Sequence, residues 1–103
     1  MILKNKKIVI SAGASGIGWA TAKVLDQRGA KVFVCDNDEG RVKAINRDKK
    51  NKIKAFVCNA DEEKEVYNFF KEIKKITTTL DCLINNVGIA GPTGSIENLN
   101  YKD

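Results

Sequence analysis

The chain has 103 residues, enough for one domain, which we place at residues 1–103. Hydrophobic residues make up 43% and charged residues 30%, a balance typical of soluble globular proteins. No apolar run approaches the roughly 18 residues of a membrane span, and the amino-terminal segment is too short for a signal peptide. We therefore expect a cytoplasmic protein with no membrane partner.

The formal charge is +5, but the only dense basic run, residues 47–54, lacks aromatic residues and falls in an expected loop. We therefore expect no nucleic-acid partner.

Strand and helix patterns alternate along the first 85 residues. Residues 8–10, 32–35, 55–58 and 82–84 form short apolar runs, and continuous rather than alternating hydrophobicity favours strands covered on both faces. The expected elements, in chain order, are strand 7–11, helix 16–28, strand 31–36, helix 39–46, strand 53–58, helix 62–76 and strand 81–85, followed by a loop. This alternation predicts an α/β fold with right-handed crossovers and a Rossmann-like, doubly wound parallel sheet of strand order 3-2-1-4.

Each of the longer helices has an apolar stripe. The first is expected to bury Ile17, Ala20, Val24 and Leu25 and to end at Gly29, a residue suited to a left-handed helix terminus. For helix 62–76 we expect Asp61 as the N-cap, with acidic residues in its first turn and lysines in its last. Its predicted stripe is Val66, Phe69, Phe70, Ile73 and Ile76.

The three cysteines, Cys35, Cys58 and Cys82, fall inside or at the ends of expected strands. Their spacing matches no C-x-x-C pattern, and the chain has no histidine, so we expect no metal site. Cysteine among apolar strand residues is usually a reduced, buried thiol, and this is our expectation for all three.

Residues 11–18 form a glycine-rich segment between the first strand and the first helix. Such a turn brings backbone N–H groups and the positive end of a helix dipole close to a phosphate. A spaced glycine pattern alone also occurs in ordinary loops, but its position between strand and helix is the context that dinucleotide binding requires.

Three motifs together resemble the short-chain dehydrogenase/reductase family. Ser11-Ala12-(x)3-Gly16-Ile17-Gly18 resembles its T-G-x-x-x-G-x-G turn. Asn85-Asn86-Val87-Gly88 is similar to its N-N-A-G motif after the fourth strand, and Cys58-Asn59-Ala60-Asp61 to the end of its third strand. Nearly the whole chain takes part in this resemblance, but it covers only the first half of the family pattern, with the C-terminal half absent.

The resemblance implies a set of cofactor-binding residues and no catalytic residue within the chain. The pyrophosphate would be bound by Gly13, Ser15, Gly16, Ile17 and Gly18. The ribose would be bound by Asp36, the adenine by Asn59 and Ala60, and the inner ribose by Asn86 and Gly88. The family's catalytic serine and Tyr-x-x-x-Lys have no match after Asn85.

Asp36 ends the second expected strand, 18 positions after Gly18. A carboxylate there can accept hydrogen bonds from ribose hydroxyls and repel a 2′-phosphate, which favours NAD over NADP. Ser15 supports this choice, since NADP-preferring relatives often have a basic residue at that position. Alternatively, Asp36 is only a turn residue, because residues 36–40 are rich in turn formers.

Ala12 departs from the family pattern, which has glycine there. If the backbone needs a positive φ at this position, alanine costs about 1 kcal/mol or more, whereas in an extended conformation the methyl group costs nothing.

Tyr67 and Lys71 have the Tyr-x-x-x-Lys spacing but precede Asn85 on an expected helix surface, so we interpret them as a non-catalytic pair. We therefore expect the NAD-binding portion of an oxidoreductase that transfers a hydride between nicotinamide and an alcohol or carbonyl, forms a homo-oligomer, and is inactive as an isolated chain. Two alternatives stay open, a stand-alone nucleotide-binding module and an interaction fragment that pairs through its fourth strand.

Overall fold

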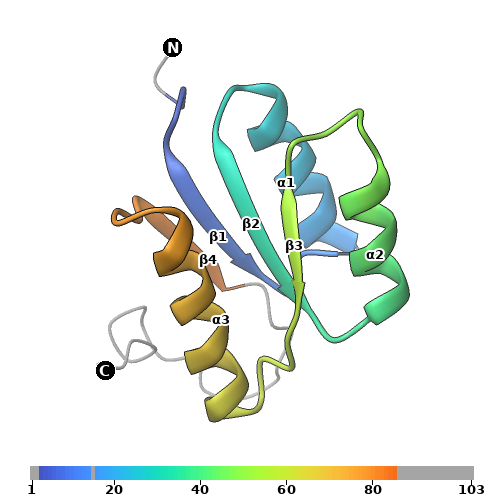
Figure 1. Ribbon diagram of the computed structural model, residues 1–103. Coiled ribbons are helices and arrows are strands. Elements are labelled where there is room, and N and C mark those ends of the chain that lie inside the picture. Colours follow the sequence, from blue (N-terminus) through green and yellow to red (C-terminus); the bar gives the residue numbers. More distant parts are fainter. Residues whose placement is uncertain (1–2, 15, 86–103) are drawn as a thin grey trace.

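The computed structural model describes residues 3–14 and 16–85 and places four strands and three helices in them (Figure 1). Each predicted element is present, and each predicted boundary lies within one residue of the observed one. The elements are β1 (Lys7–Ser11), α1 (Gly16–Gln27), β2 (Lys31–Asp36), α2 (Glu39–Arg47), β3 (Lys54–Val57), α3 (Glu63–Ile76) and β4 (Cys82–Asn85).

The four strands form one parallel sheet in the order β3-β2-β1-β4, which confirms the predicted topology. β1 lies in the centre, with Ile10 opposite Val34 of β2 and Ile84 of β4. From β1 the chain adds β2 and β3 on one side and then β4 on the other, so the direction of strand addition reverses between β1 and β4. In sheets of this kind, ligands bind at the carboxyl ends of the strands beside this reversal.

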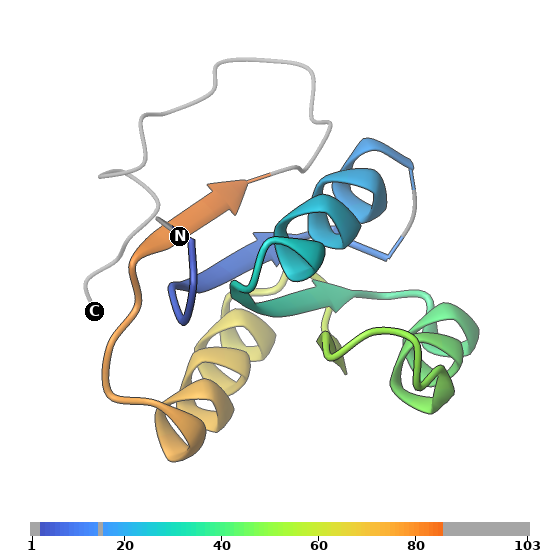
Figure 2. The same ribbon diagram turned by 90° about the horizontal axis from the view of Figure 1, so that it is seen from above.

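Two separate apolar layers cover the faces of the sheet. On one face Val32 and Val34 pack with residues of α1 and α2, including Ala22 and Val42. On the other face Val9, Phe33 and Cys35 pack with Phe69 and Ile73 of α3. Figure 2 shows α1 and α3 on opposite sides of β1 and β2. The sheet is therefore doubly wound, as the continuous apolar strands predicted.

The predicted buried face of α1 is wrong. Ile17 is 78% exposed, Val24 is 49% exposed, and Ala20 is also exposed. The helix instead turns Gly18 and Ala22 toward the sheet. Small side chains let a helix approach a sheet closely, and a count of large apolar residues does not reveal such a face. The predictions for Leu25, which packs partly buried on the core, and for Gly29, which has φ +93°, are confirmed.

The predicted N-cap of α3 is also wrong. The cap is Glu62, and its side chain makes no capping hydrogen bond. Asp61 lies in a turn that begins at Asn59, because its N–H donates to Asn59 Oδ1 at 2.9 Å and the Glu62 N–H donates to Asn59 O at 3.0 Å. The predicted stripe of α3 holds for its buried and partly buried members, but Ile76 is 49% exposed.

Cys35 and Cys58 are buried and free, as predicted, whereas Cys82 is free but exposed. Cys82 is the first residue of β4, at the amino end of a strand whose side chains are only partly covered. None of the helices in the described part of the chain is long and apolar enough to cross a membrane.

Candidate functional site

The predicted site residues that the structure describes lie at or beyond the carboxyl ends of the strands. These residues are Gly13, Gly16, Ile17, Gly18, Asp36, Asn59 and Ala60. Ser15, Asn86 and Gly88 lie outside the described residues. At the ends of the two neighbouring strands β1 and β4, the Ser11 hydroxyl donates to Asn85 Oδ1 at 2.9 Å. This side-chain bond joins the end of β1, where the glycine-rich turn begins, to the end of β4, where the motif of residues 85–88 begins.

The first half of the glycine-rich turn is tightly packed on β2. The Gly13 N–H donates to Cys35 O at 3.2 Å. A Cβ at Gly13 would lie 2.8 Å from Val34 Cγ1, closer than real side chains allow. A ligand contact to the Gly13 N–H would have to replace its bond to β2, so its present role is packing.

The backbone of Ala12 has φ +53°. Of the two conformations that the sequence left open for Ala12, extended or left-handed, the structure therefore has the left-handed one, which costs a residue with a Cβ free energy.

The second half of the turn is open. Gly16 has φ +61°, and a Cβ built there meets no described atom within 4 Å. α1 begins at this residue, and no acidic side chain lies in its first turn. The first N–H groups of a helix have no partner within the helix, and the helix dipole places positive charge there. The backbone at Gly16 and Ile17 is therefore open and suited to a phosphate, whereas Gly18 in the same turn is buried against the sheet.

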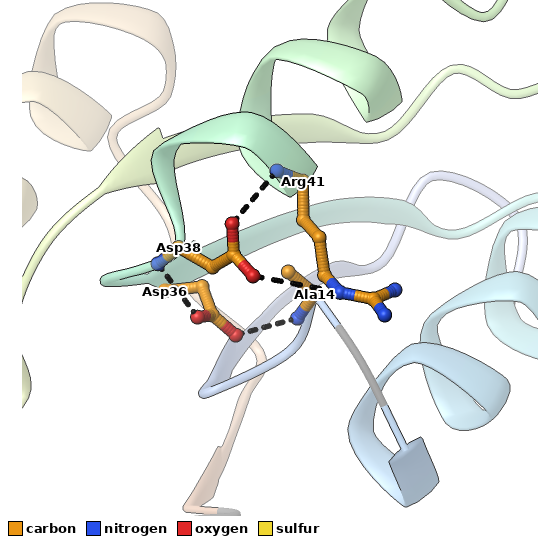
Figure 3. Close-up of polar contacts among 4 residues, drawn as sticks. All are labelled: Ala14, Asp36, Asp38 and Arg41. Carbon is orange, nitrogen blue, oxygen red and sulfur yellow. Dashed lines mark hydrogen bonds and ion pairs between the residues drawn. The ribbon is translucent and has the colours of Figure 1, made fainter.

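The carboxylate of Asp36 joins β2 to both neighbouring loops (Figure 3). Its Oδ2 accepts from the Ala14 N–H at 3.0 Å, and its Oδ1 accepts from the Asp38 N–H at 3.0 Å. The second contact is the local turn role that the sequence left open. The first reaches across 22 residues to the glycine-rich turn and has no part in a local turn. A carboxylate has about four lone pairs, so both contacts leave acceptor capacity for ribose hydroxyls.

Sequence reasoning missed the polar arrangement at the start of α2. Asp38 is the N-cap: its Oδ1 accepts from the Arg41 N–H at 3.1 Å, and its Oδ2 lies 3.5 Å from Arg41 Nε (Figure 3). The signal was present, since an aspartate immediately before a helix and an arginine three residues later match the spacing of a cap and an ion pair.

The loop after β3 is held by a second missed contact. The Asn59 N–H donates to Glu65 Oε1 of α3 at 2.7 Å. Together with the Asp61 contact to Asn59 Oδ1, this bond fixes the loop that contains the predicted adenine-binding residues Asn59 and Ala60. A glutamate in the first turn of a helix is common for the helix dipole alone, so its sequence position did not reveal this role.

Two thiols lie beneath the site. A hydrogen bond with the Cys58 thiol lowers the pKa of Cys35, assisted by the Ala12 N–H and opposed by burial and by the charge of Asp36. The pKa of Cys58 is raised far above its ordinary value, first by this same hydrogen bond and then by burial. Cys58 therefore stays protonated. Among the described residues no group of three Cys, Asp or Glu side chains is placed to hold a metal ion.

Tyr67 and Lys71 lie one turn apart on α3, and Lys71 Nζ is 5.5 Å from the centre of the Tyr67 ring. Tyr67 is 60% exposed. This geometry is a surface cation–π contact. That the pair has no catalytic role stays a prediction.

Comparison with known proteins agrees with this geometry. A family model described as short chain dehydrogenase matches residues 6–103. The chain is 30% identical over 88 residues to the L-fucose dehydrogenase of Bos taurus, covering 85% of this chain and 32% of the relative. It is 35% identical over 102 residues to short-chain dehydrogenase reductase 5 of Arabidopsis thaliana, covering 97% of this chain and 39% of that protein.

A solved structure of a short chain dehydrogenase from Mycobacterium smegmatis superposes with a TM-score of 0.75 at 28% identity, covering 92% of this chain and 41% of that one. The chain thus spans less than half the length of the relatives it matches. The family match over residues 6–103 and the shared fold show that the chain belongs to the short-chain dehydrogenase/reductase family.

Proposed function

We propose that this chain is the NAD-binding portion of an oxidoreductase that transfers a hydride between nicotinamide and a small-molecule alcohol or carbonyl. One observation carries the proposal: the Asp36 carboxylate, at the end of β2, is bonded to the backbone of the glycine-rich turn before α1. A ribose acceptor and a phosphate-binding turn are thereby held together at the switch point of the sheet.

In this proposal the residues of the chain bind and orient the cofactor. Gly16, Ile17 and Gly18 donate N–H groups to the pyrophosphate, whose charge the α1 dipole stabilises. Asp36 accepts from the adenosine ribose, and the loop of Asn59 and Ala60 holds the adenine. From the family resemblance we add Ser15 at the pyrophosphate, and Asn86 and Gly88 at the inner ribose. The resemblance also places Gly13 at the pyrophosphate, where it would shape the turn, since its N–H donates to Cys35 O.

The bound NAD supplies the hydride acceptor, and the reaction also needs a group that takes or gives a proton. We assign no residue of this chain to that step, so the isolated chain is expected to bind cofactor without turnover. The activity of a whole protein, its location in the cytoplasm and its homo-oligomeric state are part of the proposal.

Calorimetric titration with NAD and NADP tests the proposal. We expect NAD to bind more tightly, because a 2′-phosphate would approach the Asp36 charge. Asp36→Asn should narrow the difference while keeping an oxygen for the Ala14 N–H. Asp48→Asn is the matched control: it removes an equal charge at the other end of α2 and should leave the preference unchanged. Equal affinities, or tighter NADP binding, would remove Asp36 from this role, and binding of neither cofactor would contradict the proposed function.

A further inference from the structure

The start of α2 contains two features that proteins use to bind phosphate, and a single side chain occupies both. Backbone N–H groups at a helix start and an arginine guanidinium each favour a phosphate. Here the Arg41 N–H, in the first turn of α2, donates to Asp38 Oδ1 at 3.1 Å. The guanidinium Nε of the same arginine lies 3.5 Å from Asp38 Oδ2. One carboxylate thus neutralises both groups.

This arrangement lies directly beside the proposed ribose site. Asp36 Oδ1 accepts from the Asp38 N–H at 3.0 Å, so the N-cap of α2 is bonded to the residue that would hold the ribose (Figure 3). With the ribose held by Asp36 as proposed, a phosphate on its 2′-hydroxyl is expected close to the first turn of α2, because Asp36 and Asp38 are joined by this bond. Gly40, the second residue of α2, has no side chain that could block a phosphate from approaching this turn.

The local charge is unfavourable for such a phosphate only because of the acidic residues. Residues 36–41 contain three carboxylates and one guanidinium. The next cation along the helix, Lys43, is paired with Glu39 at 3.3 Å. The Asp38 and Arg41 side chains are 50% and 59% exposed, so a bound nucleotide could reach both of them.

We propose that Asp38 is a specificity-determining residue, which excludes an adenosine 2′-phosphate by neutralising Arg41 and the first turn of α2. This inference rests on the proposed function and deepens it. Asp36 selects against the phosphate through its own charge, whereas Asp38 does so by occupying the cation that would otherwise bind it. Removing the Asp38 charge should release Arg41 for the phosphate even with Asp36 in place.

The decisive variant is Asp38→Asn. Asparagine is as good an N-cap as aspartate and can still accept from the Arg41 N–H, so the helix start is preserved. Calorimetric titrations use NAD, NADP and two fragments that isolate the adenosine end, adenosine 5′-monophosphate and adenosine 2′,5′-bisphosphate. We expect Asp38→Asn to tighten NADP and the bisphosphate by about tenfold, the gain of one charge-assisted contact, and to change NAD and the monophosphate by less than about twofold.

Two controls separate this explanation from a general loss of negative charge. Asp48→Asn removes an equal charge from the other end of α2, leaves the pair of Asp38 and Arg41 intact and, among the described ion pairs, frees no cation, so it should give at most about a twofold gain for NADP. The double variant Asp38→Asn/Arg41→Gln should lose the gain. Unchanged NADP affinity in Asp38→Asn, an equal gain in Asp48→Asn, or a gain that survives the loss of Arg41 would each overturn the inference while NAD binding stands. If the unsubstituted chain does not bind NAD, the proposed function itself fails.

Discussion

Ala12→Gly should stabilise the protein. Ala12 has φ +53°, and a left-handed backbone costs an L-residue with a Cβ roughly 1–2 kcal/mol. Glycine removes that cost but loses about 0.5–1 kcal/mol through the greater freedom of the unfolded chain. The expected net gain in the free energy of unfolding is therefore about 0.5–1 kcal/mol, which for a domain of this size raises Tm by about 3–6 °C.

Thermal unfolding followed by circular dichroism measures this shift, and the chain offers a matched control two residues away. Ala14 is 2% exposed and is not among the described non-glycine residues with positive φ. Ala14→Gly therefore removes a buried methyl group, relieves no strain and should lower Tm. A decrease in Tm for Ala12→Gly similar to that for Ala14→Gly would refute the assignment of strain to Ala12.

Two further predictions concern the hydrogen bonds of Asn46 and the association of chains. Asn46→Ala should lower the free energy of unfolding, measured with urea, by about 2 kcal/mol. The Asn46 amide donates to Ala55 O and accepts from the Ala55 N–H, each at 2.9 Å, and one such bond contributes about 1 kcal/mol. Asn46→Asp keeps the acceptor and should lower the free energy of unfolding by less. The chain should also self-associate, because the apolar side chains of Ile17 and Val24 are exposed on α1 and Tyr67 is exposed on α3. Sedimentation at several protein concentrations measures the association. The mass of a single chain at every concentration would instead favour the stand-alone module.

The strands and their order were predictable because the signal was redundant. Each strand is a continuous apolar run, and each alternates with a helical pattern, so the parallel order follows from chain connectivity. The exact position of a buried stripe lacked such redundancy. Gly18 and Ala22 face the sheet although larger apolar residues stand beside them in sequence, since close packing rewards small size as well as hydrophobicity.

The candidate site was predictable in its location but not in its internal bonds. Position after a strand placed Asp36 and Asn59 at the correct edge of the sheet. The partner of Asp36, Ala14, is 22 residues away in another loop, and the partner of Asn59, Glu65, is set by how the loop after β3 enters α3, so neither bond could be inferred from a strand-end position. The conformation of Ala12 was open for a similar reason, because a sequence pattern shows that a residue departs from glycine but not which φ its neighbours impose.

β2 organises the glycine-rich turn by binding two successive N–H groups. The Gly13 N–H donates to the Cys35 carbonyl, and the Ala14 N–H donates to the Asp36 carboxylate. These donors are occupied, so the N–H groups that begin α1 at Gly16 are the ones placed for a phosphate. The first half of the turn is thus attached to the sheet, and in the proposed function this attachment positions the second half for the pyrophosphate. Asp36 belongs to this attachment, so under the proposed function the fold of the turn and the choice of cofactor would depend on the same carboxylate.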